Sequence, residues 1–112
     1  MPQVKPEVES FARIKVIGVG GSGKNTVNHM INSRVKGVDF IAVNTDAQDL
    51  HYAQAKQKIN IGKNLTRGLG TGMNPDLGQQ AAEENREDIV EALKGADMIF
   101  ITAGFGGGTG SG

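Results

Sequence analysis

Glycine is concentrated in two short segments of this 112-residue chain, and both have the composition of loops that bind phosphate. Residues 106–112 contain five glycines, and residues 18–25 read GVGGSGKN. Glycine allows positive φ and lacks the Cβ that would hold a ligand away, so successive backbone N–H groups can converge on one anion. Taken alone, the terminal run is more typical of a flexible glycine tail than of a phosphate loop.

The first segment matches the dinucleotide-binding fingerprint GxGxxG through Gly18, Gly20 and Gly23. That motif requires a strand before it, a helix after it and an acidic residue about 20 positions further on. Asp39 and Asp46 are available for the acidic position. A purely structural interpretation stays open, in which the glycines only allow a helix to pack closely on a strand.

The same segment nearly matches a second phosphate motif, GxxxxGK, with Lys24 as the phosphate lysine. A P-loop places a Ser or Thr hydroxyl on Mg²⁺ directly after that lysine. Asn25 has no hydroxyl, so the match fails at a chemically important atom. The motifs together indicate nucleotide binding without deciding which nucleotide.

Composition excludes several other classes of function. Twelve basic residues balance twelve acidic ones, so the chain has no electrostatic footprint for nucleic acid, and phosphate binding has to rely on backbone donors. There is no cysteine, which fits a reducing compartment. Residues 1–12 are polar and unlike a signal peptide, and no apolar run is long enough to span a bilayer. We expect a cytoplasmic protein with a disordered arm over residues 1–12.

The elements that must position the glycine segments follow from alternating apolar runs and helical patterns. Strands are predicted over residues 13–19, 38–44, 58–61 and 97–103, and helices over 24–33, 47–55 and 75–94. The last helix has strong end signals, with Asn74 as N-cap, Pro75 at the first position, Asp76 in the first turn and Gly95 at the end. Residues 62–74 read as a glycine-rich loop.

This βαβαβαβ order predicts an α/β fold, an open parallel sheet with helices on both faces and the first strand in its interior. The loops after strands one and four then lie side by side at the carboxyl edge of the sheet. Two glycine loops facing one crevice at that switch point form a nucleotide site. We also expect the fourth strand to have an unpaired edge and the 112-residue chain alone to be marginally stable.

Together these segments resemble the tubulin/FtsZ superfamily. Residues 106–112 match its signature GGGTG(S/T)G, and residues 18–27 (GVGGSGKNTV) are similar to the first nucleotide loop of the bacterial and archaeal FtsZ family. Three more segments resemble FtsZ in the same order and spacing: residues 40–50 (FIAVNTDAQDL), 66–84 and 96–112 (ADMIFITAGFGGGTGSG). The resemblance covers nearly all of residues 13–112 and implies the N-terminal part of a Rossmann-like GTPase domain.

The resemblance also implies which residues contact GTP or GDP. The first loop would contact the phosphates, Asn44 and Asp46 fall in the second loop, the third loop would sense the γ-phosphate, and the terminal loop would wrap the phosphates. The implied contacts are Gly20, Gly21, Ser22, Gly23, Lys24, Asn25, Asn44, Thr71, Gly72, Met73, Asn74, Gly107, Gly108, Thr109 and Gly110. Mg²⁺ would accompany the nucleotide, and no metal site made by the protein alone is expected.

As a whole, the family implies a self-assembling GTPase of cell division, located at midcell. Its subunits form head-to-tail homopolymers, and water is activated at the subunit contact by an acidic loop from the later half of the next protomer. Membrane-tethering and division proteins are expected partners, without direct membrane insertion. Since residues 1–112 lack that later half, we expect them to supply phosphate loops but no catalytic residue, and not to hydrolyse GTP alone.

The sequence leaves open the role of Lys24, the roles of four aspartates and two other functions. Lys24 stands where the family usually has glycine, and we expect it to point to solvent rather than to a phosphate. Asp39, Asp46, Asp76 and Asp97 are better explained by capping and solvation than by catalysis. Two other functions remain: a dinucleotide-dependent oxidoreductase, and an assembly module in which nucleotide gates polymerisation without turnover.

Overall fold

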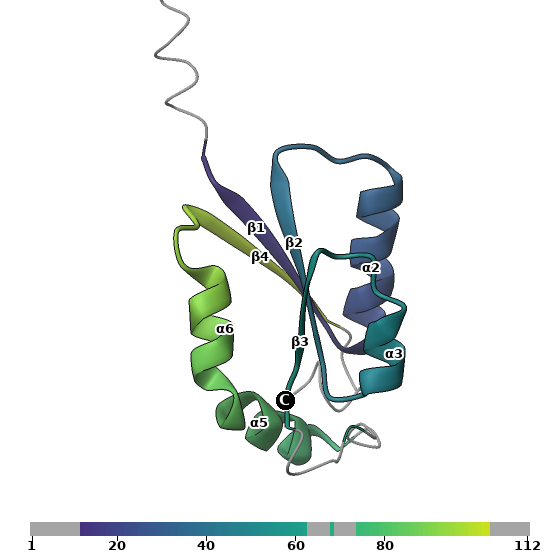
Figure 1. Cartoon of the computed structure of the whole chain (residues 1–112), viewed down its shortest axis with the longest axis vertical. Coiled ribbons are helices and arrows are strands. Elements are labelled where there is room, and N and C mark those ends of the chain that lie inside the picture. The colour runs from purple at the N-terminus through teal and green to yellow at the C-terminus, as the bar shows by residue number, and fades with distance from the viewer. Residues whose placement is uncertain (1–11, 63–67, 69–73, 104–112) are drawn as a thin grey trace, which may run out of the picture.

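The chain folds into a parallel β-sheet with helices on both of its faces (Figure 1). The computed structural model describes residues 12–62, 68 and 74–103. Its elements, in chain order, are β1 (Ile14–Val19), α2 (Gly20–Asn32), β2 (Val38–Asn44), α3 (Ala47–His51), β3 (Gln57–Asn60), α5 (Pro75–Glu84), α6 (Arg86–Leu93) and β4 (Met98–Ala103). Nearly all of the predicted N-terminal arm, residues 1–11, lies outside the described residues.

The strand order is β3-β2-β1-β4, and every pairing is parallel. The predicted fold class and the interior position of β1 are therefore confirmed. At the carboxyl end of β1, Val19 lies opposite Val43 of β2 on one side and Ala103 of β4 on the other. The chain segments that leave β1, β2 and β4 consequently all start at the same edge of the sheet.

Side chains alternate between the faces of each strand, which produces two separate cores. Val16 and Ala42 lie in the core that α2 and α3 cover, together with Val27 of α2. Ile17 and Ile41 lie in the opposite core, which α5 and α6 cover. Figure 1 shows these two helical pairs on opposite sides of the sheet.

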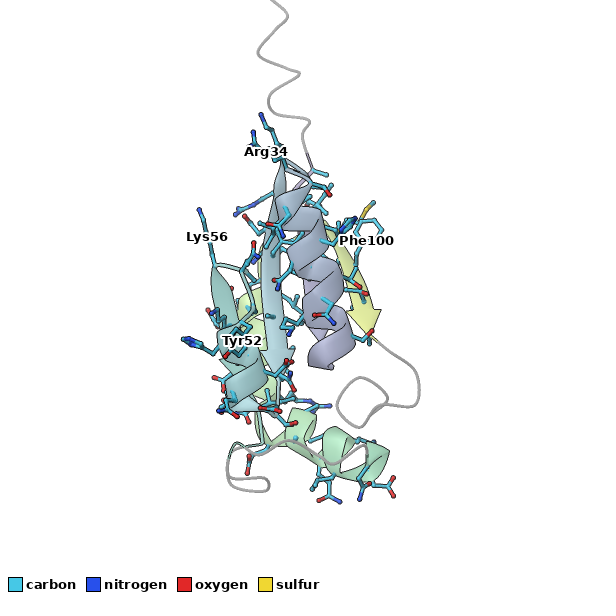
Figure 2. All side chains as sticks on the ribbon, turned by 90° about the vertical axis from the view of Figure 1, so that its right-hand side faces the viewer. Arg34, Tyr52, Lys56 and Phe100 are labelled. Atoms are coloured by element: carbon cyan, nitrogen blue, oxygen red, sulfur yellow. The ribbon has the colours of Figure 1, made fainter. Side chains whose placement is uncertain are left out.

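β4 is paired but poorly covered. Four of its residues are exposed, and two are partly buried. The exposed side chains are large and apolar: Met98, Ile99, Phe100 and Ile101. In Figure 2, the labelled Phe100 projects at the margin of the sheet beside α2. Within the described residues β4 has β1 as its one neighbour, as the predicted edge position requires.

The start of α2 differs from the prediction. The sequence favoured a loop up to Lys24, but α2 begins at Gly20, directly after β1. Gly20 has φ +76, a conformation that glycine adopts without steric cost, and it turns the chain from strand to helix within one residue. The low helix propensity of Gly23 is overridden by packing of its backbone against Gly18 of β1 and Thr102 of β4.

The predicted long helix over residues 75–94 is two helices, broken at Asn85. The Asn85 side chain accepts a hydrogen bond from Gly62 N–H at 2.8 Å and donates one to Asp88 at 2.8 Å. Asn85 has φ −114 and ψ 28, outside the helical range, and its side chain is held by Gly62, two residues after β3. The helix therefore breaks at this residue. The other differences are small: α3 ends at His51 instead of residue 55, and β3 spans Gln57–Asn60 instead of 58–61.

Candidate functional site

The first turn of α2 faces the carboxyl edge of the sheet with its backbone donors uncapped. Val19, the N-cap residue, makes no side-chain capping bond, and the first turn contains no acidic residue. The first N–H groups of a helix have no partner inside the helix, and the helix dipole adds positive potential there. Such an end is suited to phosphate, and Gly20 and Gly21 begin it.

Gly18 and Gly23 have a different purpose, which is close packing. A Cβ on Gly18 would lie 2.5 Å from the Gly23 carbonyl oxygen, and a Cβ on Gly23 would lie 2.6 Å from the Thr102 carbonyl oxygen. Both distances are shorter than van der Waals contact. The close packing that the structural interpretation of the GxGxxG motif requires is therefore present at these two positions, and it fixes the start of α2 against β1 and β4.

Lys24 does not point to solvent, so that prediction is wrong. Its Nζ lies 2.8 Å from Oδ1 of Asp49, and its side chain is only 14% exposed. The physical reason is that α3 runs beside the start of α2 and brings a carboxylate within reach of the lysine. Sequence reasoning missed Asp49, because it lies 25 positions from Lys24 and no local pattern links the two residues.

Asn44, the last residue of β2, is a buried polar residue that is 4% exposed. Its Nδ2 donates to Oδ2 of Asp49 at 2.9 Å, and its Oδ1 accepts from the backbone N–H of Asp46 at 3.1 Å. Its carbonyl oxygen accepts bonds from Ile61 N–H and from Asn60 Nδ2, both at 3.0 Å. Two predicted site residues, Lys24 and Asn44, are thus brought together through Asp49.

Asp46 acts as a helix cap, as predicted. Its Oδ1 accepts a hydrogen bond from Asp49 N–H at 3.0 Å, at the start of α3. The same turn contacts the 62–74 loop, because Ala47 N–H donates to the Gly68 carbonyl oxygen at 3.1 Å. One point of the predicted third loop therefore lies against the second.

Asn74 ends the third loop as the predicted N-cap of α5. Its Oδ1 accepts bonds from Asp76 N–H at 3.0 Å and from Leu77 N–H at 3.3 Å. Of the other predicted contacts, Ser22 and Asn25 are exposed on α2. The remaining ones lie outside the described residues: Thr71, Gly72, Met73, Gly107, Gly108, Thr109 and Gly110.

The other aspartates considered from the sequence have structural surroundings. Asp97 accepts a hydrogen bond from Arg13 N–H at 2.8 Å, and Asp76 is exposed in the first turn of α5. Asp39 is exposed near the start of β2, away from the carboxyl edge. In the described ranges, no three His, Cys, Asp or Glu side chains gather where they could hold a metal ion. No helix within those ranges has the length and apolar character to cross a membrane.

This chain is similar in sequence and in fold to proteins of known structure. The sequence model of the Tubulin/FtsZ family, GTPase domain, matches residues 13–112. An FtsZ mutant from M. jannaschii is 47% identical in sequence with a TM-score of 0.89, over 96% of this chain and 32% of that one. An empty FtsZ dimer from M. jannaschii is 44% identical with a TM-score of 0.89, over 98% of this chain and 34% of that one.

A more distant structure is similar over most of the chain. The GTPγS-bound protofilament of CetZ2 from Haloferax volcanii is 32% identical with a TM-score of 0.79. The match covers 89% of this chain and 33% of that one. The chain therefore spans about a third of the length of the solved structures that it resembles.

Proposed function

Since the chain belongs to the Tubulin/FtsZ family and matches its GTPase domain, we propose that it supplies the phosphate-binding loops of a GTP-binding, filament-forming protein. The chain spans about a third of the FtsZ structures that it matches, so hydrolysis and assembly are proposed for the whole gene product. In that product the nucleotide-binding site is completed at the contact between subunits. The finer role that we propose is formation of the division ring at midcell.

The observation that carries this proposal is the convergence of donors at one edge of the sheet. The first turn of α2 has no side-chain cap and lies against Asp49, which bonds both the buried Asn44 amide and Asp46. β4 ends opposite Val19, so the segment that follows Ala103 starts at the same place. A triphosphate would be held by backbone N–H groups, since Lys24 in the first turns of α2 is already paired with Asp49.

We assign the residues as follows. The backbone N–H groups of residues 20–25 contact the phosphates, Asn44 fixes the second loop, Thr71–Asn74 approach the γ-phosphate, and Gly107–Gly110 wrap the phosphates. Mg²⁺ binds through the phosphate oxygens rather than through a set of protein ligands. Support for self-assembly comes from the relatives, which include an FtsZ dimer and a CetZ2 protofilament with GTPγS bound.

Calorimetry on the full gene product tests the ligand. We expect GTP and GDP to bind, with ATP and NAD at least about a hundredfold weaker, because a pocket that hydrogen-bonds guanine leaves its polar groups unpaired with adenine. Binding of NAD in preference to GDP would instead indicate a dinucleotide-dependent oxidoreductase.

Light scattering separates the two assembly mechanisms. A filament-forming GTPase scatters with GTP and loses the signal as phosphate is released, whereas a non-hydrolysable analogue keeps it high. Equal and lasting signals with GTP and the analogue, without phosphate release, would indicate a module in which nucleotide only gates polymerisation.

A further inference from the structure

Asp49 lies at the junction of two predicted nucleotide loops, yet neither glycine motif includes it. We propose that Asp49 is a positioning residue: anchored by Lys24, it orients the Asn44 amide and holds the β2–α3 turn against the first turn of α2. This inference rests on the proposed function, since the property that it tunes is nucleotide affinity.

The two oxygens of the Asp49 carboxylate have different partners. Oδ1 faces Lys24 Nζ at 2.8 Å, and Oδ2 accepts from Asn44 Nδ2 at 2.9 Å. The backbone N–H of the same residue is bonded to Asp46 at 3.0 Å. Because the main chain and both oxygens are engaged, the carboxylate is fixed in position and direction.

The Asn44 amide can take only one orientation in this network. Its oxygen accepts from Asp46 N–H at 3.1 Å while its nitrogen donates to Asp49. A flipped amide would place its NH₂ group against a backbone N–H and its oxygen against a carboxylate, so both contacts would become repulsive. At 4% exposure, water cannot readily replace either partner.

Lys24 acts through Asp49 rather than on a phosphate directly. The lysine side chain is 14% exposed and the Asp49 side chain 29% exposed, so the pair is screened less than a surface ion pair. The chain contains a useful contrast in Lys94 and Glu91, whose charges lie 3.1 Å apart but are both well exposed. Such exposed pairs contribute little to structure.

The two possible roles of Lys24 predict opposite effects of one substitution. If Lys24 and Asp49 position Asn44, Asp49→Asn weakens nucleotide binding, because it removes one of the two carboxylate oxygens that face Lys24 and Asn44. If Lys24 is a phosphate ligand that Asp49 restrains, the same substitution frees the lysine and tightens binding. Asp49→Asn keeps the side-chain volume, so this sign is not confused with a packing defect.

Titration of GDP into the full gene product tests the inference, because GDP avoids assembly driven by the triphosphate. We expect Lys24→Met and Asp49→Asn each to weaken GDP binding about tenfold, and the double variant to be no weaker than the worse single one. Lys24→Arg should restore affinity to within about threefold, since its guanidinium can also bind the carboxylate. Lys94→Met, the matched control, should bind GDP like the unchanged protein.

A second readout does not depend on nucleotide. In ¹⁵N-correlated spectra of the nucleotide-free protein, Asp49→Asn and Lys24→Met should both shift the side-chain amide resonances of Asn44, and Lys94→Met should not. Unshifted amide resonances would contradict the positioning role.

The other possible results of the GDP titration also decide whether the inference holds. Tighter GDP binding by Asp49→Asn would overturn the inference in favour of direct phosphate contact, and unchanged affinity with a lowered melting temperature would show a merely structural pair. If the unchanged protein binds no guanine nucleotide, the proposed function fails and the inference fails with it. Tight binding that no variant alters overturns the inference alone.

Discussion

Ile41 and Ile101 are the same residue in nearly the same place, and they differ greatly in burial. Both lie directly opposite Ile17 of β1, Ile41 on β2 and Ile101 on β4. Yet Ile41 is 1% exposed and Ile101 is 69% exposed. Strand pairing and side-chain burial are therefore set by different features. The backbone hydrogen bonds determine which strands pair, and the helices that cover each strand determine how far its side chains are buried.

The same contrast runs along both strands. β2 is most buried at its carboxyl end, where its last four residues, including Asn44, are all buried. β4 has no fully buried residue. The half of the sheet that leads into the β2–α3 turn is thus the packed half, whereas β4 holds its place through β1 and through the contact between Gly23 and Thr102.

The largest expected effect is on the packed side. Ile41→Ala should lower the free energy of unfolding by about 2–5 kcal/mol, because it leaves a cavity in the core beneath α5 and α6. Urea denaturation of the full gene product, followed by circular dichroism, measures this. A loss below about 1 kcal/mol would mean that the face around Ile41 is not tightly packed.

Gly23→Ala should have the next largest effect, because it strains the junction between the two halves. The added Cβ would lie 2.6 Å from the Thr102 carbonyl and 2.7 Å from the Gly18 carbonyl carbon, which are backbone atoms that cannot rotate away. Overpacking of this kind costs about 1–3 kcal/mol.

Gly21→Ala is the matched control for that substitution. Its Cβ would lie 3.3 Å from Asp49 Oδ2, a contact that a shift of a few tenths of an ångström relieves without moving a backbone carbonyl. Thermal unfolding compares the two variants, and equal melting temperatures would contradict the packing role of Gly23.

Asn74→Ala should have a smaller effect, of about 1 kcal/mol, since two N–H groups at the start of α5 lose their acceptor. Replacement by Asp keeps an acceptor oxygen and should restore most of the stability. Urea denaturation of both variants measures the difference, and equal losses in Ala and Asp would show that capping is not the reason for Asn74.

Ile101→Ala should have the smallest effect, below about 0.5 kcal/mol in the 112-residue chain, because the side chain is already mostly in water. The same substitution in the full gene product provides an informative comparison. A cost of about 2 kcal/mol or more there, measured by urea denaturation, would show that further sequence covers β4.

The sequence was sufficient to predict the strands and the interior position of β1. Apolar runs placed β2 at its observed bounds and β1 and β4 within one residue, and the crossover rule placed β1 in the interior. Asn74 was identified as a cap because its partners are two and three residues away.

What local sequence did not predict depends on contacts between distant residues. The start of α2 depends on Gly23 packing against β4, and the break at Asn85 depends on Gly62, 23 residues earlier. The pairing of Lys24 with Asp49 likewise requires α3 to lie beside α2. In each case the local pattern was compatible with two structures, and tertiary packing selected one.

We propose that guanine-nucleotide phosphates bind to the backbone where β1 and β2 end, at the first turn of α2 and the turn after Asn44. Amide chemical shifts and hydrogen exchange of the full gene product, with and without GDP, test it directly. We predict large shifts and slowed exchange over residues 20–25 and 44–46, with none at Gly37, near the opposite end of β2. Unchanged amides over residues 20–25 in protein saturated with GDP would contradict the account.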